Sequence, residues 1–443
     1  MSARTESSIT LEWKASSGNV QGYYLYRGRT RVGKTSATSY TFVGLSCGRS
    51  YKLGVQAYDG AGHHSRKASI SASTAACPVE PVPPPTEPPP PESSPGPVGS
   101  LLPEGLQPSL GTTYYVSTSG SDSQSGSAEA PWRTVQKALN TLQPGERALV
   151  RAGTYAQDLV MTRAGSAEAP ITVAAYPGET VTLRPASSSG DTYPIEFYGA
   201  AYVRLQGFVI EGSDGTSAAN VYVTGSSHHI EIAGNEIRYG QDSGFYTDAT
   251  TSYVYVVGNR IHDNGWNHEV GQHQSHGIYL KGANHLIANN VIYNHAYGFG
   301  LHIYGANHDT VVVDNTIAAS AHSSIVVGGP GGVSNITIRN NLLHGGNWGV
   351  QMDSTCPTGP ITVERNLIDA YNLGAVESGC STVSASGNLS ANPSFVDYAN
   401  RDLRLQADSP ALDVAAAEWS APYDAEGTSR PQGAGPDIGA FER

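Results

Sequence analysis

The sequence lacks the features that mark several large classes of protein. It contains no run of eighteen apolar residues, which excludes a membrane-spanning helix. Positive charge is scarce: 26 lysines and arginines stand against 38 acidic residues, and the net charge of −12 argues against nucleic acid and against a broadly cationic groove. An acidic polysaccharide would therefore need local positive charge or a bound cation. No signal peptide precedes the first β-type segment, and we take the N-terminus as trimmed.

The most informative feature that is present is a short phrase that occurs seven times between residues 234 and 390. Its versions are GNEI, GNRI, NNVI, DNTI, NNLL, RNLI and GNLS, with asparagine second in each: Asn235, Asn259, Asn290, Asn315, Asn341, Asn366 and Asn388. The asparagines are roughly 22 to 31 residues apart, and each phrase follows a β-type run such as IEIA or TVVV. This period is typical of a solenoid coil. Asparagines at one turn of successive coils can hydrogen-bond to each other at about 4.8 Å spacing.

This pattern resembles a right-handed parallel β-helix of the pectate-lyase type with its asparagine ladder, over roughly residues 113 to 443. Nearer the N-terminus, residues 8 to 77 alternate with period two, and Trp13, Leu45 and Tyr51 fit a small β-sandwich that resembles a fibronectin type III module. The predicted fold class is therefore all-β: a right-handed parallel β-helix (solenoid) with an N-terminal fibronectin type III-like β-sandwich.

The chain is predicted to contain three parts. Residues 1–77 form the fibronectin type III-like module, which we expect to act as a spacer or stabiliser. Residues 78–110 form a proline-rich linker in extended polyproline conformation. Residues 111–443 form the β-helix, with a helix near Trp132–Leu142 that covers the first coil and a C-terminal cap after Asn388.

The four cysteines fall into two local pairs, Cys47 with Cys77 and Cys356 with Cys380. The second pair follows the same strand in consecutive coils, so stacking should bring the two sulfurs within reach of a disulfide. Zinc is the alternative, but no CxxC spacing supports it. Two disulfides indicate an oxidising compartment, and we expect an extracellular, secreted protein.

The resemblance implies that a substrate lies along one sheet of the β-helix. On the corresponding strands, alternation directs Val221, Phe245, Ile278, Leu301, Ile325 and Val350 inward. Two outward rows remain. The first is Tyr222, Tyr246, Tyr279, His302, Val326 and Gln351, and the second is Thr224, Asp248, Lys281, Tyr304, Gly328 and Asp353. Tyrosines beside polar groups suit a sugar-binding floor, although outward aromatics also simply cover sheets.

Lys281 stands out because the β-helix contains only one other lysine, Lys137 in the expected helix. A surface ion pair with Asp248 is the alternative to a functional role. The coil from Asn259 to Asn290 is about six residues longer than its neighbours, and the excess, immediately before the strand GIYL, predicts a loop over the sheet. That loop contains Trp266, His268, His273 and His276, which we expect to help hold the substrate; a transition-metal site is the competing interpretation.

Two cleavage reactions fit such a face. β-Elimination of an acidic, uronate-containing polysaccharide needs a base for the C5 proton and an acid for the leaving oxygen, and lysine, histidine and tyrosine are suited to these tasks. Lys281 or His302 would be the base and Tyr246 or Tyr279 the acid, with Asp248 among the catalytic candidates. Tyr222, Tyr304, Gln351 and Asp353 would contact the substrate. Lyase activity is the leading prediction.

Hydrolysis needs two carboxylates about 5 to 9.5 Å apart. Asp248 and Asp353 lie four coils apart, roughly 19 Å, which excludes that pair, but Asp248 with Asp242, Asp263 or Glu269 stays open. A non-catalytic glycan-binding or adhesive β-helix is the third hypothesis. A divalent cation such as Ca²⁺ is the one cofactor that the resemblance implies, although no acidic calcium-binding cluster is evident. We expect a monomer whose partner is a polysaccharide, without nucleic acid.

Overall fold

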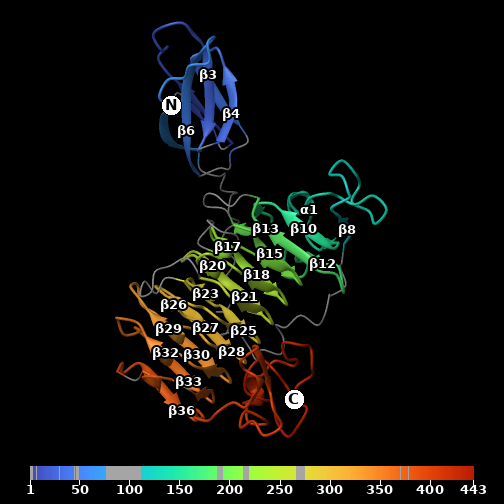
Figure 1. The fold of residues 1–443 in the computed structure, drawn as a ribbon, viewed down its shortest axis with the longest axis vertical. Helices are drawn as coiled ribbons and strands as arrows, with labels where there is room; N and C mark the ends of the chain where they lie inside the picture. Colours follow the sequence, from blue (N-terminus) through green and yellow to red (C-terminus); the bar gives the residue numbers. More distant parts are fainter. Residues whose placement is uncertain are drawn as a thin grey trace, which may run out of the picture. The chain divides into compact units, whose positions relative to one another are not determined.

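The computed structural model describes residues 3–5, 7–28, 30–43, 45, 49–75, 111–186, 193–212, 219–265, 275–369, 371–377 and 379–443. Two compact units follow each other along the chain, Met1–Pro91 and Glu92–Arg443, and each has its own hydrophobic core (Figure 1).

The first unit is a sandwich of two antiparallel sheets. One sheet has the order β1-β2-β5 and the other β4-β3-β6-β7. The strands are β1 Ala3–Arg4, β2 Ser8–Glu12, β3 Val20–Arg27, β4 Thr30–Thr35, β5 Ser39–Val43, β6 Ser50–Asp59 and β7 Ala68–Ser73. Alternate residues of both sheets, such as Ile9, Leu25 and Leu53, are fully buried between them, and Trp13 and Tyr51 pack at the edge of this core. This arrangement confirms the predicted β-sandwich.

The second unit is a β-helix of three parallel sheets (Figure 1). The first sheet contains β8 Thr113–Val116, β9 Arg147–Val150, β12 Ile171–Ala175, β15 Ala201–Gln206, β18 His228–Ala233, β21 Ser252–Val257, β24 Leu286–Ala288, β27 His308–Val313, β30 Ser334–Arg339, β33 Ile361–Glu364 and β36 Val383–Ser386. The second contains β10 Gly153–Ala156, β13 Val181–Arg184, β16 Val209–Glu211, β19 Glu236–Arg238, β22 Arg260–His262, β25 Val291–Tyr293, β28 Thr316–Ala318, β31 Leu342–His344 and β34 Leu367–Asp369. The third contains β11 Leu159–Met161, β14 Ile195–Tyr198, β17 Ala219–Thr224, β20 Ser243–Thr247, β23 Ile278–Leu280, β26 Leu301–Tyr304, β29 Ser323–Gly328, β32 Trp348–Met352 and β35 Gly374–Val376.

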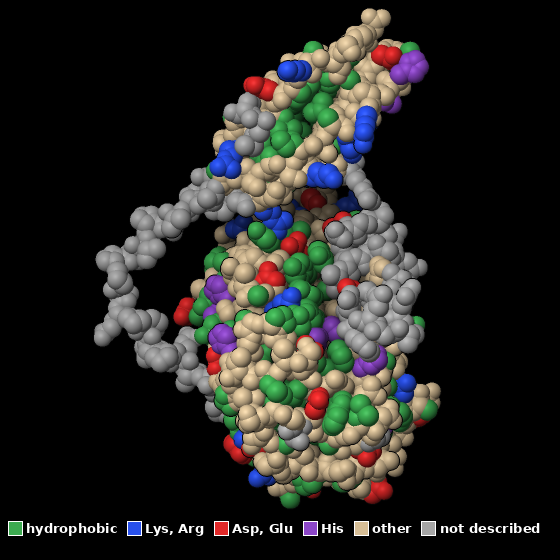
Figure 2. All heavy atoms as spheres, turned by 90° about the vertical axis from the view of Figure 1, so that its left-hand side faces the viewer, with side chains coloured by type: hydrophobic (Ala, Val, Ile, Leu, Met, Phe, Trp, Pro, Cys, Tyr) green, Lys and Arg blue, Asp and Glu red, His purple; other side chains and the backbone are tan. Residues whose placement is uncertain are grey.

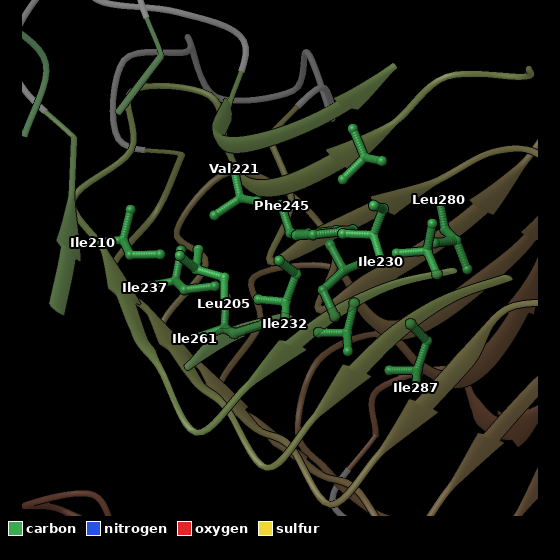
Figure 3. Close-up of a cluster of buried hydrophobic side chains, with 14 of the residues drawn as sticks. Leu205, Ile210, Val221, Ile230, Ile232, Ile237, Phe245, Ile261, Leu280 and Ile287 are labelled. Carbon is green, nitrogen blue, oxygen red and sulfur yellow. The ribbon is translucent and has the colours of Figure 1, made fainter. Parts of the chain in front are cut away.

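Each coil contributes one strand to each sheet, and the inward residues of all three sheets meet in one core. Figure 3 shows Leu205, Ile237 and Phe245, from three different sheets, pointing into the same interior. Each of these is at most 1% exposed. Burial of one such side chain contributes about 1.5 to 3 kcal/mol to the free energy of folding, and each coil of the solenoid adds similar contributions.

The asparagine ladder is formed as the sequence predicts. The side-chain oxygen of Asn315 accepts both the backbone N–H and the side-chain amide of Asn290 at 2.9 Å, and the same paired bonds join all seven asparagines in order. Each central asparagine also donates to backbone carbonyls of its own and the preceding coil, for example Val313 and Ile287. The ladder therefore satisfies polar groups that the turn removes from water.

The helix α1, Val135–Thr141, is capped at its N-terminus by Thr134, whose hydroxyl accepts the backbone N–H of Lys137. It packs against β8 and β11 at the start of the solenoid. Near the other end, Cys356 and Cys380 form the predicted disulfide between successive coils, with their Cα atoms 5.5 Å apart. The expected pair of Cys47 and Cys77 lies outside the described residues.

The segment after Asn388, predicted to be a C-terminal cap, packs along the outer side of the coils and includes β37 Phe395–Asp397, β38 Asp402–Leu405 and the 3-10 helix η2 Ala417–Trp419. Figure 1 shows it beside β25 and β28. Its docking uses the residue that precedes the ladder asparagine, which has a positive φ angle in each of these coils. Asn289 and Asn340 bond the backbone of the segment, and Asp314 accepts the N–H of Ala421 at 2.8 Å.

The corresponding residue is glycine in two preceding coils, at Gly234 and Gly258. Glycine is the ordinary choice for a positive φ angle, and asparagine and aspartate are the side chains that tolerate it best. Asn289, Asp314 and Asn340 thus tolerate the positive φ angle of the turn and also bind the C-terminal segment.

Replacement of Asn315 by alanine should destabilise the β-helix strongly. The change leaves the backbone N–H of Asn290 without its acceptor and removes the donor to Ile287, and each orphaned buried group costs about 1 to 3 kcal/mol. The free energy of unfolding, measured by chemical denaturation, should fall by several times that of the exposed control Asn372→Ala. Equal effects for both variants would contradict the structural role of the ladder.

The stability of the unit should depend on the ionisation of Asp314. Burial raises the pKa of its carboxyl from 3.8 to about 6. The folded state therefore binds this proton more tightly than the unfolded chain, so the contribution, about 3 kcal/mol, is full below pH about 4 and lost as the pH rises through 6. As the pH rises from 4 to 8, the melting temperature of the unmodified chain should therefore fall relative to that of Asp314→Asn. Parallel curves of melting temperature against pH would exclude this assignment.

Candidate active site

The outward side chains of the third sheet form two rows in the predicted register. In the first row, each residue lies directly beside the next: Tyr222, Tyr246, Tyr279, His302, Val326 and Gln351. The second row lies two residues further along each strand: Thr224, Asp248, Lys281, Tyr304, Gly328 and Asp353. The predicted inward residues, from Val221 to Val350, are all fully buried. Figure 2, in which the left-hand side of Figure 1 faces the viewer, shows charged side chains scattered singly over this side of the β-helix.

Lys281 lies among three tyrosines of neighbouring coils. Its Nζ donates a hydrogen bond of 3.0 Å to the hydroxyl of Tyr246. The same atom is 5.4 Å from the ring centroid of Tyr246, 5.1 Å from that of Tyr279 and 5.5 Å from that of Tyr304, distances at which a cation interacts with an aromatic face. We call these three side chains the tyrosine cage. Burial and the neighbouring tyrosines raise the pKa of the Tyr279 phenol above its ordinary value.

Asp248 does not pair with Lys281 in the part of the chain that the structure describes. Its carboxylate accepts the hydroxyls of Thr224 and Thr250 and the backbone N–H of Gly225. Burial raises the pKa of Asp248, but these hydrogen bonds outweigh burial, and the pKa lies below its ordinary value. Asp248 therefore stays ionised and links the turns of two successive coils, and among the described residues Lys281 has no carboxylate partner.

His302 is less accessible than its outward position predicts: its exposed fraction is 7%. The sequence-based expectation is wrong here because the rings of His276, Tyr279, Phe299 and Tyr304 surround the imidazole, with centroids 4.9 to 5.4 Å away. Burial lowers the pKa of His302 to about 4, so its imidazole is neutral at pH 7.

The hydrogen bonds around this imidazole define which nitrogen carries its proton. The backbone N–H of Phe299 donates to Nδ1 of His276 at 3.4 Å, so a neutral His276 carries its proton on Nε2. That Nε2 lies 3.3 Å from Nδ1 of His302, which must then accept. The lone pair of His302 is therefore occupied, and its own proton resides on Nε2, which has no hydrogen-bond partner. This arrangement suits a donor better than a base.

The aromatic side chains of the first row end one coil beyond Lys281, at His302. Towards the N-terminus, Tyr246, Tyr222 and Tyr193 follow one another with ring centroids 5.2 and 4.9 Å apart. Towards the C-terminus, the row continues with Val326 and with Gln351, whose side-chain oxygen accepts the hydroxyl of Ser323 at 2.7 Å.

Next to the second row, Gly329 accommodates the ring of Tyr304, since a Cβ atom there would lie 2.5 Å from that ring. The carboxylate of Asp353 accepts the N–H of Ser354. The tyrosines of the face thus reach one coil beyond Lys281, to Tyr304, and the coils after that carry Val326, Gly328, Gln351 and Asp353 instead.

Some predicted site residues fall where the structure makes no statement: Trp266, His268 and His273 lie outside the described residues. His276 is described and is buried against Tyr279 and Phe299. Within the described ranges no three His, Cys, Asp or Glu side chains gather as metal ligands do, so these residues do not fit a protein-built Ca²⁺ site. In those ranges there is also no helix long and apolar enough to cross a membrane.

Sequence reasoning missed several residues that shape the site. His285 and Thr247 bond the backbone of Lys281, and Phe299 orients His276. A histidine in the polar stretch KGANHL resembles a surface residue, so no sequence signal marks His285 as fully buried. Tyr193 precedes β14 and packs against the ring of Tyr222, but Glu196 is the residue aligned with Tyr222, so the repeat spacing does not mark Tyr193.

Comparisons with known families agree with this architecture. Residues 114–320 match the family described as Pel9A-like, right handed beta helix region, and residues 267–392 match a right handed beta helix region. Residues 1–73 match the fibronectin type III domain. The crystal structure of pectate lyase Pel9A superimposes with a TM-score of 0.57 at 18% identity and covers 75% of this chain and 96% of that protein, a likeness that concerns the fold.

Curated relatives match over short stretches only. The uncharacterized protein YwoF of Bacillus subtilis is 33% identical over 29% of this chain and 29% of its own length. Pectate lyase PEL9 of Emericella nidulans is 36% identical over 17% of this chain and 18% of its own. Exoglucanase B of Cellulomonas fimi is 41% identical over 18% of this chain and 7% of its own. The chain thus matches less than a third of the length of each of these three relatives.

Proposed function

The chain is a right-handed parallel β-helix protein of the pectate-lyase-like superfamily that carries a fibronectin type III module, and we propose that it cleaves a uronate-containing polysaccharide by β-elimination. The observation that carries the proposal is the contact of Lys281 with Tyr246, 3.0 Å between Nζ and the phenol oxygen, on the sheet face lined by tyrosines. A base and an acid side by side suit an elimination in which the proton and the leaving oxygen depart from one face of the sugar.

The proposed reaction balances with these two residues. The neutral amine of Lys281 takes the C5 proton, the C4–O bond breaks, and a C4=C5 double bond forms. The hydroxyl of Tyr246 gives its proton to the leaving oxygen. Lys281, now an ammonium, returns a proton to the Tyr246 phenolate through their hydrogen bond, and both groups regain their starting state.

The other residues of the face serve binding in this proposal. Tyr279 and Tyr304 offer hydroxyls and ring faces beside Lys281, and Tyr222 extends the floor for sugar stacking. Gln351 and Asp353 provide polar contacts on the opposite side. Lys281 is favoured over His302 as the base because the imidazole is buried, its lowered pKa makes it a weak base, and its Nδ1 already accepts a hydrogen bond from His276. His302 then supports the rings of Tyr279 and Tyr304.

A hydrolase with paired carboxylates is less well supported. Asp248 is engaged in the turn, and Asp263 follows β22 in the second sheet, where it bonds His262 at 2.6 Å. The names of the relatives, pectate lyase PEL9 and pectate lyase Pel9A, agree with elimination. The disulfide between Cys356 and Cys380 supports an extracellular location.

Lys281→Ala and Tyr246→Phe should abolish most of the turnover. Loss of a general acid or base costs about 10²- to 10⁴-fold in rate, and neither side chain belongs to the interior core. The measurement is absorbance near 235 nm with pectate, alginate, glycosaminoglycan and neutral glycans, which detects the unsaturated product of elimination. Melting temperatures should change little.

Two matched controls accompany these variants. Lys137→Ala removes the other lysine of the β-helix, and Tyr222→Phe removes the hydroxyl next in the row. Both should retain turnover within a few-fold. A glycan that is cleaved without a signal near 235 nm would indicate hydrolysis, and undiminished turnover of Lys281→Ala would remove Lys281 from the mechanism.

A further inference from the structure

The turn that follows Lys281 is shorter than the turns that flank it. Lys281 is aligned with Asp248 in the preceding coil and with Tyr304 in the next. The first sheet resumes at the aligned residues Ser252, Ala283 and His308. Asp248 and Ser252 are four positions apart, as are Tyr304 and His308, whereas Lys281 and Ala283 are only two apart. The turn immediately after Lys281 is therefore two residues shorter than the corresponding turns of the flanking coils.

This contraction removes the residue that caps the turn in preceding coils. There, a hydroxyl three residues on closes the turn: Ser227 donates to the carbonyl of Thr224 at 2.7 Å, and Thr251 donates to that of Asp248 at 2.8 Å. After Lys281, the aligned position is Gly282, with φ of 92°, where a Cβ atom would lie 2.2 Å from the carbonyl oxygen of Thr251. No side chain fits there, so the carbonyl of Lys281 needs another donor.

Two buried side chains from outside the turn supply the missing contacts. The hydroxyl of Thr247 accepts the backbone N–H of Lys281 at 2.8 Å and donates to its carbonyl at 2.7 Å. The ring of His285 lies with Nε2 2.8 Å from the same carbonyl. Both side chains are fully buried.

The tautomer of His285 follows from its second contact. The backbone N–H of Val254 donates to Nδ1 at 3.1 Å, so Nδ1 accepts and the proton lies on Nε2, which donates to Lys281. Burial lowers the pKa of His285 to about 4, which keeps the ring neutral. Both backbone polar groups of Lys281 are thus held by fixed partners beneath the face.

We propose that Thr247 and His285 are positioning residues that hold the backbone of Lys281 so that its Nζ stays within the tyrosine cage. The inference rests on the proposed function of Lys281 for its catalytic consequence, but the placement itself is independent of activity. Both side chains bond the peptide groups of Lys281. They act only through the peptide groups of Lys281, because a base must lie within hydrogen-bond reach of the proton it takes.

The test uses the full chain and two substitutions, Thr247→Val and His285→Asn. Valine matches threonine in shape but loses the hydroxyl, and Thr247→Ser keeps the hydroxyl and should restore the behaviour of the unmodified chain. Thr310→Val is the matched control, because Thr310 is buried at the position aligned with His285 in the next coil and bonds Asn307 rather than Lys281.

Two readouts are needed, and one does not depend on activity. After reductive ¹³C-methylation of the six lysines, the methyl signal of Lys281, assigned with Lys281→Arg, should be shifted by the ring currents of the cage. Thr247→Val and His285→Asn should move this signal towards that of exposed lysines, and kcat should fall about 10- to 100-fold with little change in KM. Thr247→Ser and Thr310→Val should leave both unchanged.

The outcomes separate this inference from the proposed function. If folded Thr247→Val and His285→Asn keep the shifted signal and normal kcat while Lys281→Ala is inactive, the positioning role is wrong and the proposed base stands. If Lys281→Ala retains turnover, the proposed function fails, and the methyl signal alone decides whether the two residues hold Lys281. An equal loss in Thr310→Val would show a general packing effect and would also overturn the inference.

Discussion

The constraint on which the β-helix depends is that every coil must turn at the same place. Parallel strands in register bring identical turns on top of each other, and each turn leaves backbone groups that water cannot reach. The ladder from Asn235 to Asn388 meets this demand, because each asparagine oxygen from Asn259 onward accepts two N–H groups of the preceding coil while the amides satisfy carbonyls. A coil can therefore lengthen or shorten elsewhere but not at this corner.

Turns at the other corners can vary in length, and the candidate site lies beside two such turns. The long insertion before β23 and the short turn after it belong to the same coil, and Lys281 lies between them. The flat register of the third sheet then places one side chain per coil at about 4.8 Å intervals. Tyr246, Tyr279 and Tyr304 come from three coils, so the tyrosine cage is a property of stacking rather than of any local motif.

Among the described residues of this face, Lys281 is a cation without a carboxylate partner. Asp248 is close in register, yet its hydrogen bonds with Thr224, Thr250 and Gly225 stabilise its ionised form and direct it along the turn. Tyr246 takes the hydrogen bond of Lys281 instead.

The sequence by itself determined the solenoid, its period, the asparagine ladder, the fibronectin type III-like sandwich, the Cys356–Cys380 disulfide and the two outward rows of the third sheet. These follow from periodicity, since a repeat of about 25 residues with alternating strands admits one register. The tertiary structure alone decided that Asp248 faces its own turn, that His302 is buried, and that His285 bonds the carbonyl of Lys281. The physical reason is that these contacts depend on side-chain rotation, on turn length and, for His302, on rings of neighbouring coils, none of which leaves a periodic trace in the chain.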